Sequence, residues 1–195
     1  MARQRKPALI LFLLVLLVDL AGVLQSHAQQ SEFVKITPEP KSHAWWLRAE
    51  FQPFGTDIRG IPLARINRTW CQVTEFRNEL FPPEAMPDLT HSGGLAFSAD
   101  GFFDGSRIRQ TALIGVYQSC TGQKGSFLLV LANPPGKPAT VRYVHAMPDV
   151  QFGMLAALPD ATIQVFHCLE CDNSTKFRWD KRRKRFVQLP PGRDD

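Results

Sequence analysis

"QTALIGVYQSCTGQKGSFLLVLA", residues 110–132, is the stretch of sequence that decides the fold. Residues 110–119 and 125–132 are two apolar runs, each of a length that suits one strand. The segment between them, CTGQKG, is rich in small residues that favour a turn. The stretch therefore predicts two strands joined by a turn.

The same pattern continues on both sides of this stretch. Other short apolar runs are bounded by Pro, Gly, Asp or Asn, and they cover residues 95–99, 139–147, 152–158, 161–168, 176–180 and 185–189. Runs spaced by about ten to fifteen residues, with turns between them, are typical of an antiparallel meander or of two packed sheets. We therefore predict an α+β fold that is predominantly antiparallel β.

One segment has a different period. Its apolar residues recur every three or four positions, with charged and polar residues between them: Ile66, Trp70, Val73, Phe76 and Leu80. This spacing places side chains on one face of a helix. We predict one amphipathic helix near residues 68–80, with Asn67 at its first turn and a stop at Pro82-Pro83.

The first 28 residues have the pattern of a signal peptide. Arg3, Arg5 and Lys6 precede an apolar run over residues 8–24, and small residues in Ser26-His27-Ala28 occupy the positions that signal peptidase reads. We expect cleavage after Ala28, with an uncleaved anchor as the alternative. No later segment is apolar enough to predict a transmembrane span, so the sequence predicts a secreted or periplasmic protein.

The remaining chain has the length of one domain. Residues 29–43 are polar, with Pro38 and Pro40, and are expected to form a flexible leader before a single β-rich domain over residues 44–195. In that domain Trp45 and Trp46 suit a core position, with a surface for a sugar or a partner as the alternative.

The net charge of the mature chain is small. The whole chain has 23 basic and 18 acidic residues, of which the first 28 hold three and one, so 20 and 17 remain and the net charge is +3. The excess is local, because Lys176, Arg178 and the run Lys181–Arg185 lie close together in the sequence. The mixed charge elsewhere argues against a dedicated nucleic-acid binder.

Four cysteines follow the signal segment: Cys71, Cys120, Cys168 and Cys171. In an oxidising compartment an even number of cysteines indicates two disulfides. We favour the pairs Cys71–Cys120 and Cys168–Cys171, since the latter two are near neighbours.

Three alternatives use the same residues or nearby ones. A zinc site at Cys168, Cys171 and His167 lacks a second pair of ligands. A copper site at His145 and Met147 rests on a common pattern. A redox role for the Cys168 and Cys171 pair is disfavoured by the acidic neighbours Glu170 and Asp172. No cofactor or metal is predicted.

Residues 94–131 resemble a single blade motif of the integrin-type FG-GAP or VCBS family. Asp100 and Asp104, followed by Gly105 and an apolar strand, match the first and third carboxylates of the D-x-D/N-x-D-G loop that binds calcium in that family. Phe102 stands where the middle ligand belongs, so no calcium site is predicted here. The Asp-Gly pairs also suit turns.

Two classes of function are compatible with these residues. The sequence lacks a G-x-S-x-G elbow, an H-E-x-x-H motif and a P-loop. We therefore favour a non-enzymatic binding or structural protein of the cell envelope or extracellular space, with an unknown partner. The cationic hairpin over residues 176–185 is the candidate contact for an anionic envelope component or protein. The alternative is a hydrolase whose site assembles from His91, His145, Asp100 and Asp104.

Overall fold

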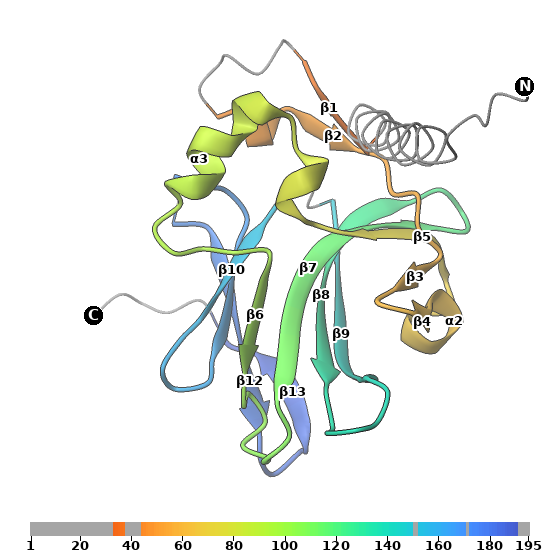
Figure 1. Ribbon diagram of the computed structural model, residues 1–195, viewed down its shortest axis with the longest axis vertical. Coiled ribbons are helices and arrows are strands. Elements are labelled where there is room, and N and C mark those ends of the chain that lie inside the picture. Colours follow the sequence, from red (N-terminus) through yellow and green to blue (C-terminus); the bar gives the residue numbers. More distant parts are fainter. Residues whose placement is uncertain (1–32, 38–43, 150–151, 171, 191–195) are drawn as a thin grey trace, which may run out of the picture.

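Strand β7 (Gln110–Ser119) lies at the centre of the fold (Figure 1). The structure, a computed structural model, describes residues 33–37, 44–149, 152–170 and 172–190. The expected signal peptide, most of the expected leader and Cys171 lie outside these residues. Strand β8 (Lys124–Ala132) pairs with β7 over its whole length, from Gln110 opposite Ala132 to Gln118 opposite Lys124. The two strands and the turn predicted for residues 110–132 are confirmed.

Strand β7 belongs to a five-stranded antiparallel sheet. One side of β7 pairs with β8, and β8 pairs with β9. The other side of β7 is shared by two short strands, since β6 pairs with its first half and β5 with its second half. The remaining strands are β5 (Trp70–Glu75), β6 (Ser98–Gly101) and β9 (Thr140–Pro148).

Both faces of the central sheet are buried, which explains why residues 112–117 and 127–131 are apolar without interruption. Ile114 and Leu128 face one hydrophobic cluster, and their neighbours Leu113 and Leu129 face another on the opposite side. Alternation of side chains along a strand distributes one apolar run between the two cores.

A second antiparallel sheet covers the first of these faces. It is a meander of β10 (Met154–Ala157), β11 (Ile163–Phe166), β12 (Ser174–Asp180) and β13 (Arg185–Gln188). A pair of backbone hydrogen bonds between Ala96 and Leu155 joins its β10 edge to the segment that leads into β6. At the opposite edge of the central sheet, His145 of β9 packs against Phe177 of β12 with ring centroids 4.9 Å apart. The predicted antiparallel β-rich fold is therefore confirmed, as two packed sheets.

The N-terminal part of the chain covers the ends and the second face of the central sheet. The segment that contains β1 and β2 contributes Phe33, Trp45, Trp46 and Phe51 to one core, and a small hairpin with a helical turn covers the other. The elements are β1 (Val34–Ile36), η1 (Trp45–Leu47), β2 (Ala49–Phe51), β3 (Asp57–Ile58), β4 (Ile61–Pro62), α2 (Leu63–Ile66), η2 (Asn78–Leu80), η3 (Pro83–Ala85) and α3 (Met86–Thr90). None of the helices within the described residues is long and apolar enough to cross a bilayer.

The folded domain begins earlier than residue 44. Val34–Ile36 pair with Ala49–Phe51, and Phe33 is fully buried. The described part of the expected leader therefore contributes a strand to a separate two-stranded sheet, β1–β2. Trp45 and Trp46 are also buried, and Trp45 Nε1 donates a hydrogen bond of 2.9 Å to Asp88 Oδ2. This favours the core interpretation of the tryptophan pair.

The helix predicted near residues 68–80 is wrong, because this segment contains strand β5. The pairing with β7 shifts between Trp70 and Gln72, so that Cys71 is an extra residue in the strand. Such a bulge places Trp70 and Val73, three positions apart, against the same cluster. Phe76 and Leu80 lie beyond the strand and face the other cluster. A bulged strand between two cores thus reproduces the spacing of an amphipathic helix.

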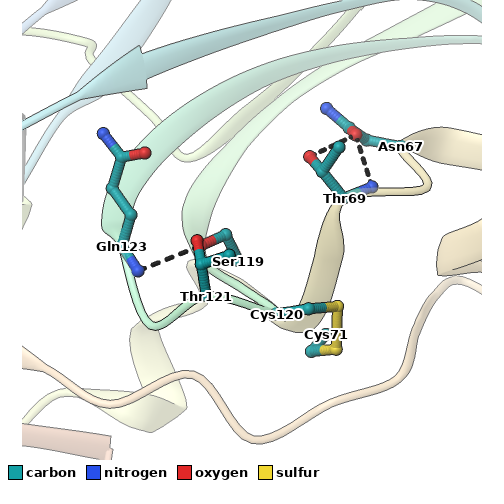
Figure 2. The surroundings of a disulfide bond; sticks show 7 residues. All are labelled: Asn67, Thr69, Cys71, Ser119, Cys120, Thr121 and Gln123. Carbon is teal, nitrogen blue, oxygen red and sulfur yellow. Dashed lines mark hydrogen bonds between the residues drawn. A yellow bond between two sulfur atoms is a disulfide. The ribbon is translucent and has the colours of Figure 1, made fainter.

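The predicted Cys71–Cys120 disulfide is confirmed, and it lies at this bulge (Figure 2). It joins the start of β5 to the residue after β7, with Cα atoms 4.8 Å apart. The backbone N–H of Cys120 also donates a hydrogen bond of 2.9 Å to the Thr69 carbonyl. Both cysteines are exposed, so the disulfide closes the end of the strand pair at the surface.

Candidate functional site

The β6–β7 loop (residues 102–109) and the tip of the β12–β13 hairpin lie at the same end of the molecule (Figure 1). A hollow of about 370 Å³ lies between them, lined by Phe103, Asp104, Gly105, Asp160, Ala161, Arg178, Trp179 and Lys181. We call this region, made of residues 100–109 and 180–185 with Arg142, Asp160 and Arg178, the basic end. The fold thus brings the Asp104 loop next to the cationic hairpin, although they are far apart in the sequence.

Asp104 is buried beneath the β6–β7 loop and accepts three hydrogen bonds. Its Oδ1 accepts the backbone N–H of Ser106 and the side-chain amide of Gln110, both at 2.9 Å, and its Oδ2 accepts Arg142 Nε at 2.8 Å. Burial opposes the charge of this carboxyl, but the hydrogen bonds from Ser106 and Arg142 outweigh it, so the pKa of Asp104 lies below its usual value. Asp104 therefore acts as a fixed anion that shapes the loop.

Arg142 connects the β6–β7 loop to the second sheet. It projects from β9, and its guanidinium lies 4.3 Å from the centroid of the Trp179 ring. The Trp179 ring packs edge-on against Phe186 of β13, with centroids 5.2 Å apart. A cation over an aromatic face contributes about 0.5–1 kcal/mol at a partly exposed site. One arginine thus contacts both an anion of the loop and an aromatic ring of the hairpin.

The hairpin tip has a defined conformation. The predicted turn at Lys181–Lys184 is confirmed, since Asp180 pairs with Arg185 and Trp179 with Phe186. Asp180 Oδ1 accepts the backbone N–H groups of Arg182 at 2.9 Å and Arg183 at 3.0 Å. The hydrogen bond from Arg183 is the main reason that the pKa of Asp180 lies below its usual value. An aspartate therefore organises the turn from which the cations project.

The seven cations predicted as a contact surface fall into two groups. Lys181–Arg185 are all exposed at the tip. Lys176 is half-buried and Arg178 exposed on β12, where they alternate with Phe177, which faces the core. The tip and the outer face of β12 are therefore both accessible.

Cations outnumber carboxylates at the basic end. Its nine cationic residues are Arg107, Arg109, Arg142, Arg178, Lys181, Arg182, Arg183, Lys184 and Arg185, and its four acidic residues are Asp100, Asp104, Asp160 and Asp180. Three of the carboxylates form ion pairs here, namely Asp100 with Arg109, Asp104 with Arg142 and Asp180 with Arg183. The difference of five positive charges exceeds the +3 expected for the whole mature chain, so the basic end carries a concentrated positive field.

The four residues of the hydrolase alternative do not converge on one cleft. His91 is exposed after α3, with its Nδ1 2.6 Å from the Pro87 carbonyl. His145 is half-buried on β9 between the rings of Tyr143 and Phe177, and burial lowers its pKa. Asp100 Oδ1 accepts the Thr111 hydroxyl, and Asp104 is engaged as described above. None of the hydrogen bonds found among the described residues joins either histidine to a carboxylate.

The residues considered for metals have other partners. Met147 is buried in the core between the sheets, as expected for a core filler. Cys168 is disulfide-bonded, and His167 lies 2.9 Å through Nε2 from the Thr175 hydroxyl. The remaining cysteine, Cys171, lies outside the described residues. Within the described ranges no group of three or more His, Cys, Asp or Glu side chains is placed to hold an ion.

A larger groove of about 520 Å³ lies elsewhere, between β5, α3 and β6. Its charged lining includes Arg59 and Glu75, which form a two-bond ion pair with each other. The hydrogen bond to Glu75 outweighs burial and raises the pKa of Arg59. The charges of Arg59 and Glu75 in this groove therefore neutralise each other, whereas the basic end has an excess of positive charge.

The comparisons with known proteins identify no relative, since no family model, no curated protein and no solved structure matches the chain. The resemblance of residues 94–131 to an integrin-type blade stays a prediction.

Several residues that form or support the basic end could not be selected from the sequence. Gln110 and Arg142 lie in runs that indicate strands, and nothing in their spacing distinguishes them from other polar strand residues. Phe102 and Ile108 are exposed, with exposed fractions of 56% and 39%, although apolar residues beside an Asp-Gly turn are often buried. In the sequence, the positive charge of this loop is visible only in Arg107 and Arg109, which flank Ile108.

Proposed function

We propose that this chain is an exported, non-catalytic binding protein and that its basic end binds an anionic partner. The observation that carries the proposal is the concentration of exposed cations on a rigid hairpin, next to a second cationic loop. Cations arranged on one surface steer an anionic partner and raise the rate of association.

Export to an oxidising compartment, secreted or periplasmic, is supported by the cysteines. Disulfides persist outside the reducing cytosol, and both Cys71–Cys120 and Cys168 are oxidised in the described structure. The segment over residues 1–28 has the composition of a signal peptide.

The fixed geometry of the surface supports a role in binding. A charged turn that is only solvated by water would not need such a geometry. Asp180 holds the turn, and the Asp104–Arg142 pair holds the neighbouring loop. Because these contacts fix the backbone of the turn and of the loop, the positions from which the cations project are set before binding, which lowers the entropy cost of ordering that backbone.

The test is binding of the mature protein to immobilised heparin and to polyphosphate over a range of salt concentrations. We expect binding that weakens as salt screens the cations. The double charge reversal Arg182→Glu with Arg183→Glu is expected to abolish it.

A matched control reverses two exposed arginines away from the basic end, Arg65→Glu with Arg68→Glu. This variant has the same net charge and is expected to retain most of the binding. Equal loss in both variants would show that net charge alone is responsible and would refute a defined contact surface.

A further inference from the structure

Exposed apolar side chains lie within the same charged surface. Four large apolar residues are exposed among the described ones, namely Leu47, Phe54, Phe102 and Ile108. Two of them, Phe102 and Ile108, lie on the β6–β7 loop beside Arg107 and Arg109. An anionic polymer would bind to the cations alone. It would leave the exposure of Phe102 and Ile108 without a function.

The loop is anchored by buried residues within it and at its end, while Phe102 and Ile108 stay exposed. Phe103 and Gln110 are buried, and Gln110 Nε2 donates hydrogen bonds to Asp104 Oδ1, the Ser106 hydroxyl and the Ile108 carbonyl. The Phe102 carbonyl accepts the N–H of Gly105 in a turn in which Gly105 has a φ of 68°. The exposure of Phe102 and Ile108 is thus a result of an ordered loop.

We propose that the basic end docks on a lipid bilayer that contains anionic phospholipid, with Phe102 and Ile108 entering the interface. This inference rests on the proposed function, because it names the anionic partner of the same surface. Cations are attracted to anionic headgroups, and apolar side chains between them are transferred from water to the acyl boundary. Cations and exposed apolar side chains at one end of the molecule match the anionic headgroups and the acyl boundary of such a bilayer.

The position of the cations relative to the loop fits a planar partner. The hairpin tip and the β6–β7 loop lie at the same end of the sheets in Figure 1 and border one hollow. Arg142 connects the two through Asp104 and Trp179. Headgroup contacts and apolar insertion can therefore occur in one orientation of the protein.

The experiment is flotation of the mature protein with vesicles of phosphatidylcholine, with and without phosphatidylglycerol. We expect binding only to the phosphatidylglycerol vesicles. Replacing Arg182 and Arg183 by Glu should weaken it at least about 25-fold, since each cation near an anionic surface contributes roughly fivefold.

The decisive variant is Phe102→Ser with Ile108→Ser, which keeps every charge. We expect about a tenfold loss of vesicle binding from the lost apolar transfer and unchanged binding to immobilised heparin. Leu47→Ser removes the most exposed of the four apolar side chains named above, which lies on η1 outside the basic end, and should leave both unchanged. Circular dichroism checks that each variant is folded.

The outcomes separate the two proposals. Heparin binding without vesicle binding, or vesicle binding that is insensitive to Phe102 and Ile108, would overturn the bilayer inference and leave the proposed function in place. Binding to neither heparin nor vesicles would overturn both. Vesicle binding that requires phosphatidylglycerol, the arginines and the two apolar residues would support both.

Discussion

Asp104 and Arg142 are 38 residues apart in the sequence, yet Asp104 Oδ2 lies 2.8 Å from Arg142 Nε. The pair joins the β6–β7 loop to β9, and through Trp179 it reaches the second sheet. The contact is therefore the point at which the two sheets and the candidate binding surface are connected. Its carboxylate is buried and its guanidinium partly exposed, with side-chain exposed fractions of 4% and 40%.

Removal of the Asp104 charge is expected to destabilise the protein. Asp104→Asn keeps the shape of the side chain but weakens the hydrogen bond from Arg142 and places an amide among donors. We expect a loss of about 1–3 kcal/mol in the free energy of unfolding, measured by urea denaturation. Arg107→Gln, at an exposed position on the same loop, should change it by less than about 0.5 kcal/mol. Equal stability of the two variants would contradict the structural role of Asp104.

Two half-buried histidines predict that stability depends on pH. Burial lowers the pKa of both His145 and His167 in the folded state. Below the ordinary histidine pKa of about 6.5, the unfolded chain then binds more protons than the folded one, so stability falls as pH decreases from about 7 to 5. His145→Phe removes one titrating group and retains a ring against Phe177. It should reduce the slope of unfolding free energy against pH, and an unchanged slope would contradict the prediction.

The Cys71–Cys120 disulfide is expected to contribute strongly to stability. Its cysteines are 49 residues apart, and closure of such a loop lowers the entropy of the unfolded chain by an amount worth about 4 kcal/mol. Cys71→Ser with Cys120→Ser should lower the urea midpoint accordingly. The oxidised wild type is the comparison, because a reductant would also reduce the disulfide of Cys168. A midpoint that does not move would show that the β5–β7 pairing needs no covalent closure.

Gly115 is expected to tolerate no side chain. A Cβ at this position of β7 would lie 2.2 Å from the Thr74 carbonyl oxygen and 2.9 Å from Glu75 Cα, both backbone atoms of β5. Gly115→Ala should therefore displace β5 and cost about 1–3 kcal/mol, as overpacking does. Ser126→Ala, a buried position of β8 whose hydroxyl has no hydrogen-bond partner in the described structure, should be neutral or stabilising. Thermal unfolding of the two variants measures the contrast.

Much of the strand pattern was predictable because strands and turns depend on neighbouring residues. The runs that became β7 through β13 are bounded by Gly, Pro, Asp or Asn, and the turn at Lys181–Lys184 was located from the two aromatic residues beside it. The Cys71–Cys120 pairing followed from the even number of cysteines and the proximity of the other two. The sequence by itself determined the strand runs and the turn, because these depend on neighbouring residues. It only favoured the Cys71–Cys120 pairing, and the structure established it.

The tertiary structure decided what local patterns leave ambiguous. The spacing of Trp70, Val73, Phe76 and Leu80 is compatible with one face of a helix, but a bulge at Cys71 and two separate cores produce it in a strand and its continuation. Likewise, many cations could neutralise Asp104, and only the packing of the second sheet against β9 selects Arg142. Contacts between distant segments form where whole sheets bury apolar surface together. The local sequence pattern therefore does not show which distant residues, such as Asp104 and Arg142, come into contact.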